Sequence, residues 1–376
     1  MRVLRFVVVG LVVVLVAMTG VALGLREPAE SVAPRRSGDA PRVTEKWRVA
    51  VSAEFVGLPA TDQAGVVVTA GASEVLAVSN AGEVEWTTAV EGALANAPRL
   101  DHDMVFVAGE REVVALRRVD GAVVWSAPTS TAGDENRANR PVVVGDVVVA
   151  TAADGLVFGL DRATGAQRWR VMLPTATTAE PAAGGGVNVA PVVVVVGIAE
   201  WRALDPGTGT TLWSAPLGLF GTSSPVVYPN GGDSLAAVAT NDQVIAVNAN
   251  TGEPAWASPG EQSELYQVPV IAANGTELLV ADHWGRLASY DPHDGRRFWS
   301  VKGRDTVAEF GEPVLVDDQL VALPLDDNGP RLGSPRGSTR LRPPADGHGV
   351  ADLPLRGLVV TTWGGTTNYV LLYEVR

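Results

Sequence analysis

A glycine four residues ahead of a tryptophan recurs along the sequence and constrains the fold more than any other feature. The six pairs are Gly82/Trp86, Gly121/Trp125, Gly165/Trp169, Gly209/Trp213, Gly252/Trp256 and Gly295/Trp299. They follow one another at intervals of about 40 residues, a period typical of repeat architectures. Because a repeat of this length is one supersecondary unit that buries its apolar face against its neighbours, the chain is predicted to form an array of similar units.

Each unit has the pattern of short antiparallel strands. β-Branched runs such as VVVGDVVVAT at 142–151 and LVFGLD at 156–161 are separated by turns rich in Gly, Asp and Asn. In four units an Asp or Asn stands eight residues before the tryptophan, at Asp161, Asp205, Asn248 and Asp291. Such a side chain favours an Asx turn and the glycine favours a positive φ, so this stretch is predicted to join two strands.

A proline ahead of each Val-rich run marks where a unit begins. The eight prolines are Pro59, Pro98, Pro141, Pro181, Pro225, Pro269, Pro313 and Pro354. Four short strands in about 43 residues, repeated around a ring, describe a β-propeller. The predicted fold class is therefore all-β, an eight-bladed β-propeller.

The two ends of the chain are predicted to complete one unit together. The eighth unit reaches Arg376 without a tryptophan, whereas Trp47 stands in a strand-like segment ahead of the first unit. An N-terminal strand carrying Trp47 then closes the propeller, which spans residues 44–376. Each repeated tryptophan, Trp47 included, is expected to wedge between neighbouring sheets, because a residue that every unit holds serves the fold rather than one site.

The motif Ala-x-Asp-x-x-Thr-Gly-x-x-x-Trp, present as ALDPGTGTTLW at 203–213, resembles the PQQ-like repeat of the quinoprotein alcohol dehydrogenase-like superfamily. The resemblance covers residues 44–376 and implies the eight-bladed propeller fold. The superfamily includes dehydrogenases that depend on calcium and pyrroloquinoline quinone (PQQ), and also BamB-like envelope proteins. The resemblance therefore implies two functions of different class, an enzyme and a binding module.

An apolar segment near the N-terminus is predicted to be a membrane helix. Residues 6–25 read FVVVGLVVVLVAMTGVALGL, in which Thr19 is the only polar side chain. Twenty residues at about 1.5 Å each make a helix of about 30 Å, the thickness of a bilayer core. Arg2 and Arg5 ahead of it favour a cytoplasmic N-terminus and an extracytoplasmic propeller. Residues 1–25 are thus predicted to be a single-pass anchor of the cell membrane, or a signal, and 26–43 a disordered tether.

Composition and motifs exclude several classes of protein. The chain has no cysteine, which excludes a disulfide scaffold, a cysteine zinc site and a thiol nucleophile. Its net charge of −13 disfavours a nucleic-acid partner. The four histidines are scattered singly, and no phosphate-binding, dinucleotide or serine-hydrolase motif is present. We therefore predict no catalytic residues, no metal ligands and no cofactor, with PQQ and calcium kept as the alternative.

Three residues outside the repeat form the candidate binding surface. Trp201 and Trp284, with His283 beside it, are expected in turns between strands, where other units hold small or polar residues. Exposed aromatic side chains are typical of contacts with a protein partner; the alternative is that each ring caps a neighbouring sheet. The predicted function is a membrane-anchored extracytoplasmic propeller that binds or scaffolds an envelope protein. The alternative function is a PQQ- and calcium-dependent quinoprotein dehydrogenase.

Overall fold

The computed structural model describes most of the chain from residue 43 onward. The described ranges are 43–54, 56–93, 97–129, 137–177, 179–186, 189–198, 200–217, 223–240, 243–259, 270–273, 276–281, 287–301, 314–316, 320–323, 331–334, 337–340, 348–353, 357–362 and 367–375. All of these residues belong to one compact unit, Ala33–Arg376. Every secondary-structure element that the structure describes is a β-strand. Within these ranges no helix has the length and apolar character to cross a membrane, and the predicted membrane segment 6–25 lies outside them.

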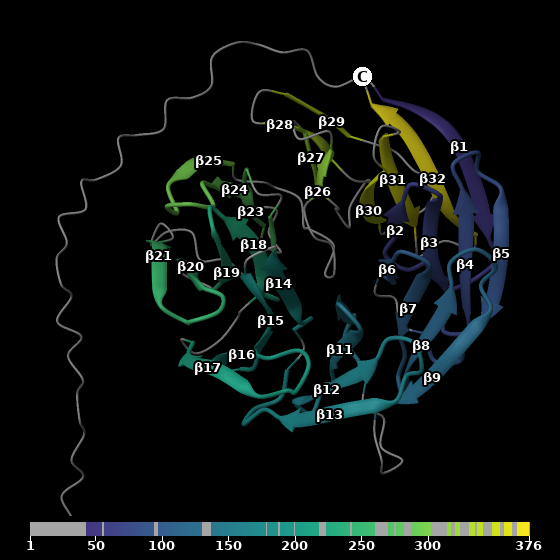
Figure 1. Ribbon diagram of the computed structural model, residues 1–376. Helices are drawn as coiled ribbons and strands as arrows, with labels where there is room; N and C mark the ends of the chain where they lie inside the picture. The colour runs from purple at the N-terminus through teal and green to yellow at the C-terminus, as the bar shows by residue number, and fades with distance from the viewer. Residues whose placement is uncertain are drawn as a thin grey trace, which may run out of the picture. The chain divides into compact units, whose positions relative to one another are not determined.

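The described strands form eight four-stranded antiparallel sheets, which we number in chain order (Figure 1). Sheet 1 holds β2 (Ala60–Asp62), β3 (Gly65–Ala70), β4 (Glu74–Ser79) and β5 (Val84–Ala89). Sheet 2 holds β6 (Arg99–Asp101), β7 (Met104–Ala108), β8 (Glu112–Arg117) and β9 (Val123–Pro128). Sheet 3 holds β10 (Val142–Val144), β11 (Val147–Thr151), β12 (Leu156–Asp161) and β13 (Gln167–Met172). Sheet 4 holds β14 (Ala182–Gly186), β15 (Val189–Val196), β16 (Glu200–Leu204) and β17 (Thr211–Pro216).

The remaining sheets follow the same order except the last. Sheet 5 holds β18 (Val226–Asn230), β19 (Asp233–Ala239), β20 (Gln243–Asn248) and β21 (Pro254–Pro259). Sheet 6 holds β22 (Val270–Ala273), β23 (Leu278–Ala281), β24 (Leu287–Tyr290) and β25 (Arg297–Val301). Sheet 7 holds β26 (Val314–Val316), β27 (Leu320–Leu323), β28 (Arg331–Ser334) and β29 (Gly337–Arg340). Sheet 8 holds β30 (His348–Leu353), β31 (Gly357–Thr362), β32 (Asn368–Val375) and, next to β32, β1 (Val43–Val51).

Neighbouring sheets pack against one another around a common centre. In Figure 1 first strands such as β2, β6, β14 and β30 lie on the inner side of their sheets, and contacts join β2 to β6, β10 to β14, β14 to β18 and β26 to β30. β30 of sheet 8 also contacts β2 of sheet 1. The arrangement is that of a β-propeller, the fold that the repeat predicts.

Sheet 8 contains strands from both ends of the chain. β1 pairs with β32 from Val43 opposite Val375 to Val51 opposite Asn368, with a bulge between Glu45 and Trp47. The N-terminal strand therefore takes the outermost position in sheet 8, the position that β5 takes in sheet 1 and β9 takes in sheet 2.

The core is divided into apolar layers that are each shared by two neighbouring sheets. Phe106 of β7 and Phe158 of β12 lie in the layer between sheets 2 and 3, and Leu76 of β4 and Val359 of β31 lie in the layer between sheets 1 and 8. The second strands β3, β7 and β11 are buried at every residue because both of their faces are covered. This explains why their sequences are continuous apolar runs rather than alternating ones.

The repeated tryptophans reach from one sheet to the next. Trp125 on β9 donates its Nε1–H to the carbonyl oxygen of Arg162, which lies in the turn between β12 and β13 of sheet 3, at 2.9 Å. A Cβ added to Gly165 in that turn would lie 2.7 Å from the Trp125 ring, so only glycine leaves room for the ring. Each glycine of the repeat thus covers the tryptophan of the preceding unit, not the one that follows it in the sequence.

The same contact recurs at six places among the described residues. The further bonds are Trp47 to the carbonyl of Asn80 at 3.0 Å, Trp86 to Arg118 at 2.9 Å, Trp169 to Pro206 at 2.8 Å, Trp213 to Ala249 at 2.8 Å and Trp256 to Pro292 at 3.0 Å. The glycines that cover these rings are Gly82, Gly121, Gly209, Gly252 and Gly295, each at positive φ. Trp299 lies at the corresponding position of β25, and the turn that follows it in the repeat falls outside the described residues.

The predicted Asx turns form these covering turns. Asp161 accepts hydrogen bonds at Oδ1 from the backbone N–H groups of Ala163 and Thr164 at 3.1 and 2.9 Å. Bonds from the Arg168 guanidinium and from Thr164 lower the pKa of Asp161 to about 2. The aspartate is therefore ionised over the physiological range and holds the turn shape that presents Gly165 to the Trp125 ring.

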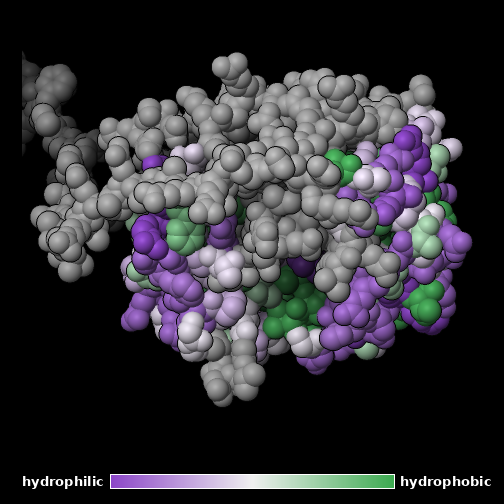
Figure 2. Space-filling model, turned by 90° about the horizontal axis from the view of Figure 1, so that it is seen from above, coloured by the Kyte–Doolittle hydropathy of each residue, from purple (hydrophilic) through white to green (hydrophobic). Residues whose placement is uncertain are grey.

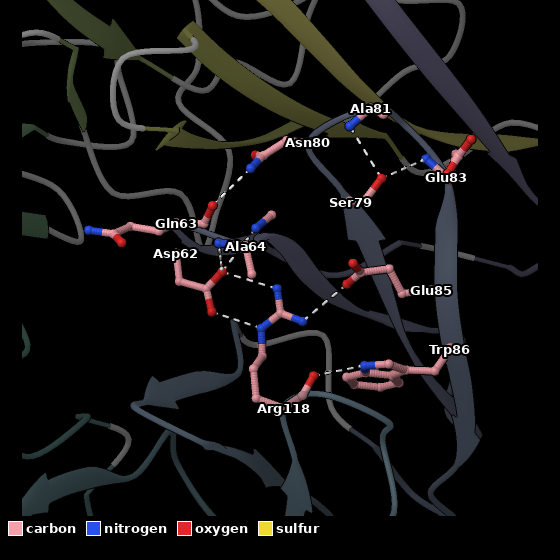
Figure 3. Close-up of polar contacts among 11 residues, drawn as sticks. Asp62, Gln63, Ala64, Ser79, Asn80, Ala81, Glu83, Glu85, Trp86 and Arg118 are labelled. Atoms are coloured by element: carbon pink, nitrogen blue, oxygen red, sulfur yellow. Dashed lines mark hydrogen bonds and ion pairs between the residues drawn. The ribbon is translucent and has the colours of Figure 1, made fainter.

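A buried arginine adds an ionic contact between sheets 1 and 2 (Figure 3). Arg118 is 6% exposed and donates from Nε and Nη2 to the two carboxylate oxygens of Asp62 at 2.7 and 3.0 Å. Its Nη1 lies 3.4 Å from the Glu85 carboxylate. Burial acts to raise the pKa of Asp62, but the bonds from Arg118 outweigh it and lower that pKa. Arg162 makes the corresponding contact one sheet further along, to Asp101 at 2.6 Å.

One predicted unit boundary is wrong. The first strands of sheets 1 to 7 each begin at the residue after a predicted boundary proline, as β2 does after Pro59. Pro354 instead follows β30, which ends at Leu353, so it lies between the first and second strands of sheet 8. The regular spacing of the prolines therefore does not mark the start of sheet 8.

Candidate protein-binding surface

Trp201 is a core residue, and its prediction as part of a contact surface is wrong. It lies on β16, is 2% exposed, and packs edge-on against Trp213 with 5.4 Å between the ring centroids and 80° between the ring planes. It also belongs to the apolar layer that contains Ala236 and Val238 of sheet 5. The alternative, a ring that caps a neighbouring sheet, describes what Trp201 does. His283 and Trp284 lie outside the described residues.

An exposed apolar side chain lies in the turn just before Trp201. Ile198, between β15 and β16, is 52% exposed, and Met172 at the end of β13 is 55% exposed. Pro174 and Ala176, in the connection from β13 to β14, are exposed as well. We call these four residues the Met172–Ile198 surface. In the face drawn in Figure 2 the coloured residues are mostly hydrophilic and the hydrophobic ones form small groups.

The connection between sheets 3 and 4 holds this surface in place. The Thr175 side-chain oxygen accepts a hydrogen bond from the backbone N–H of Ile198 at 3.0 Å, which ties the connection to the turn. A Cβ added to Gly197 would lie 2.4 Å from that oxygen, and one added to Gly155 would lie 2.5 Å from the Thr175 carbonyl oxygen. Thr175 is therefore enclosed between a turn of sheet 3 and a turn of sheet 4.

Further hydrogen bonds fix the rest of the connection. Leu173 is buried and its N–H donates to the carbonyl of Gly155 at 2.9 Å. The Thr177 hydroxyl donates to the carbonyl of Val196 and accepts from the N–H of Ala179 at 3.1 Å. Met172 and Ile198 therefore project from a backbone that is hydrogen-bonded on both sides, so a partner binding there would cost little backbone conformational entropy.

The exposed side chains of the Met172–Ile198 surface are apolar. Methionine adapts its shape to different partners and is over-represented at binding surfaces. On β16, which follows the turn of Ile198, Arg202 and Glu200 form an ion pair at 2.8 Å. Met172 and Ile198 were not predicted from the sequence, because isolated apolar residues in Val-rich units are expected to lie in the core. The position of Ile198 in a turn that begins with glycine was the available signal.

The described residues contain no cluster of carboxylate side chains that would hold calcium beside a quinone. Calcium needs several carboxylate or carbonyl oxygens around one point, and no three His, Asp or Glu side chains in the described ranges lie close enough to hold a metal ion. We therefore derive no reaction step through PQQ.

Comparison with known proteins agrees with the propeller architecture. A family model described as outer membrane protein assembly factor BamB matches residues 38–200 and 198–330. The outer membrane protein assembly factor BamB of Burkholderia pseudomallei is 24% identical over 308 residues, which cover 76% of this chain and 75% of that protein.

Solved structures show the same fold. The crystal structure of BamB from Moraxella catarrhalis superposes with a TM-score of 0.69 at 16% identity, covering 89% of this chain and 100% of that one. The quinohemoprotein alcohol dehydrogenase ADHIIG from Pseudomonas putida HK5 superposes with a TM-score of 0.63 at 14% identity, covering 88% and 76%. At these identities the likeness shows the fold alone. Because the family model matches well over half of the sequence, the chain belongs to the family described as outer membrane protein assembly factor BamB.

Proposed function

We propose that the chain is an eight-bladed β-propeller that binds or scaffolds a protein partner in the cell envelope. The observation that carries the proposal is the Met172–Ile198 surface, where two half-exposed apolar side chains stand on a hydrogen-bonded connection. Membership of a family described as an outer membrane protein assembly factor supports an envelope protein as the partner. The partner's contacting side chains are expected to be apolar, to match Met172 and Ile198.

The expected gain in binding energy is modest and measurable. Burying a whole Met or Ile side chain contributes about 1.5–3 kcal/mol, and about half of each side chain is still exposed. Covering both therefore contributes on the order of 2 kcal/mol, which corresponds to about 30-fold in affinity. A charged residue at either position adds the desolvation of an unpaired charge, so the loss in a charged variant exceeds that factor.

We further propose that residues 6–25 anchor the propeller in the cell membrane and that it lies outside the cytoplasm. The support is the length and apolar character of the segment and the arginines ahead of it. Extraction of membranes with alkaline carbonate tests the anchor. Retention of the full chain, and release of a variant with Val14→Arg and Ala17→Arg, is the expected result; release of both chains contradicts the anchor.

The test of the binding function compares the partners of three forms of the full chain in the native envelope. Proximity labelling is carried out with the wild type, with Met172→Glu combined with Ile198→Glu, and with Leu212→Glu. Leu212 on β17 is 45% exposed and serves as the matched control for adding charge to an exposed apolar site. We expect the wild type and the control to label the same envelope proteins, and the double variant to lose at least one of them. Equal labelling by all three forms contradicts the proposed surface.

The quinoprotein dehydrogenase remains the alternative function, and only the shared fold supports it. It is tested by adding PQQ and calcium to the purified chain. A saturable change in the quinone absorbance together with a raised melting temperature would favour the enzyme; neither is expected for a binding module.

A further inference from the structure

A second group of exposed apolar residues lies on the outer strands of sheets 1 and 2, away from the Met172–Ile198 connection. Seven large hydrophobic residues are exposed among the described residues, and four of them belong to this group. They are Val84 on β5 at 50%, Val119 in the turn between β8 and β9 at 76%, and Val123 and Val124 on β9 at 54% and 41%. We call them the β9 edge.

Contacts between the two sheets bring these residues together. The turn that carries Val119 lies on β5, because the Trp86 Nε1–H donates to the carbonyl of Arg118 at 2.9 Å. The Thr88 hydroxyl donates to the carbonyl of Gly121 in the same turn at 2.6 Å. The outer strand of sheet 1 and the start of β9 therefore share one stretch of surface.

β9 differs from the other outer strands at the two positions before the repeated tryptophan. These positions hold Val123 and Val124 on β9, whereas the other units hold Glu45 with Lys46, Val84 with Glu85, Gln167 with Arg168, Thr211 with Leu212, Pro254 with Ala255 and Arg297 with Phe298. Charged residues and proline on an edge strand disfavour pairing with another chain, and in β9 the proline, Pro128, is the last residue of the strand. β9 is the outer strand that places two apolar β-branched residues there, and it pairs only with β8 among the described strands.

The charged side chains around the β9 edge are negative on balance. Glu83 and Glu85 are exposed beside Val84, whereas Arg118 is 6% exposed and bonded to Asp62. Arg117 is held by Asp120 at 2.7 Å. The chain carries −13, of which residues 1–42 contribute +3, so the propeller carries −16. Electrostatic attraction therefore favours a cationic partner at this edge.

We propose that the β9 edge is a docking site for an extended segment of another protein, with apolar side chains alternating with Lys or Arg. The segment adds a strand to β9, its backbone bonds to the free edge, and its cationic side chains face Glu83 and Glu85. In strand addition the main chain supplies affinity and the alternate side chains supply specificity. A second copy of this chain fits less well, because two bodies of −16 repel and one short strand offers far less than the roughly 800 Å² per partner of a stable interface.

The test uses the purified full chain and a labelled peptide of alternating Val and Lys, as long as the six residues of β9. Binding is measured by fluorescence anisotropy at low salt, and the site is located by hydrogen exchange of the β9 amides. The matched variants are Val124→Lys and Leu212→Lys, which occupy the same repeat position on β9 and β17 and are 41% and 45% exposed in the wild type. A peptide of alternating Val and Glu controls for charge.

We expect saturable binding of the Val–Lys peptide, protection of the β9 amides, and loss of at least about tenfold in affinity in Val124→Lys but not in Leu212→Lys. The Val–Glu peptide is expected not to bind. Absence of saturable binding, or equal binding by both variants, overturns the proposal. A concentration-dependent dimer that Val124→Lys abolishes also overturns it, because the occupant is then a second copy. Met172 and Ile198 are unchanged throughout, so failure here leaves the proposed function intact.

Discussion

Replacing Gly165 by Ala tests the contact that joins the sheets. Gly165 has a φ of +71° and an added Cβ would lie 2.7 Å from the Trp125 ring. Gly145, in the hairpin turn between β10 and β11, has a φ of +60° and no atom within 4 Å of an added Cβ. The two glycines share the backbone strain and differ in the ring contact, so Gly145→Ala is the matched control.

The two substitutions are expected to lower the free energy of unfolding by amounts that differ severalfold. A left-handed backbone conformation costs an L-residue about 1–2 kcal/mol. Alanine also makes the unfolded chain less flexible than glycine does, which offsets about 0.4–1 kcal/mol of that cost. Gly145→Ala is therefore expected to lower the free energy of unfolding by about 1 kcal/mol. Gly165→Ala adds an overpacking term of about 1–3 kcal/mol. It also weakens the 2.9 Å bond from Trp125 to Arg162, which is worth about 1 kcal/mol. The total loss is about 3–5 kcal/mol.

Urea unfolding followed by tryptophan fluorescence gives the comparison, with the midpoints read at unchanged slope. A lower midpoint in Gly165→Ala than in Gly145→Ala is expected, together with a changed fluorescence of the native state as the Trp125 ring moves. Equal losses in the two variants would refute the reasoning, because the ring contact would then add nothing to the strain of the turn.

Three further predictions concern the polar contacts at the turns. Arg118→Ala leaves the Asp62 carboxylate without its partner and is expected to lose about 3 kcal/mol of stability; Arg117→Ala, whose side chain is 52% exposed, should lose less than about 1 kcal/mol. Urea unfolding of both tests this, and equal losses would contradict it. The pKa of Asp62 is lowered in the folded protein, so its contribution is present above the unfolded value of about 4 and is lost as the pH falls through the folded value. Asp62→Asn should therefore destabilise at pH 7 and cease to do so in acid; a loss independent of pH would show that the charge is not responsible. His102 has a φ of 51°, and His102→Gly should raise the free energy of unfolding by about 0.5–1 kcal/mol because glycine adopts this backbone without strain. An unchanged or lower free energy of unfolding would show that contacts of the imidazole stabilise the turn.

Much of the fold follows from the repeat because each unit carries the same local signals. Every unit needs the contacts that the Asx residue, the glycine and the tryptophan make. The spacing of these three residues therefore predicts the positions of the strands in each sheet. Trp47 was predicted to complete the last unit, and it bonds to Asn80 as the other tryptophans bond to their turns. Pro354 failed as a marker because proline is tolerated at either end of a strand, so its spacing alone does not show whether it precedes or follows β30.

The candidate surface was harder to predict from the sequence than the fold. Trp201 was predicted to lie in a turn, but β16 begins at Glu200, so Trp201 is already a strand residue. Its ring lies on the buried face of that strand and packs against Trp213 and sheet 5. The exposure of Ile198 depends on the contact of its turn with Thr175 of the preceding sheet. Such contacts join residues more than twenty positions apart, and a single sequence carries no local signal for them.

The most direct measurement of the proposed function is site-specific photocrosslinking in the native envelope. A photoreactive amino acid is placed at position 198 in one form of the full chain and at position 212 in another, since both wild-type side chains are about half exposed. A discrete crosslinked protein at position 198, missing at position 212 and lost when Met172→Glu is added, is the result that a protein-binding propeller predicts. Identical patterns at the two positions, or no crosslinked protein at either, would contradict it.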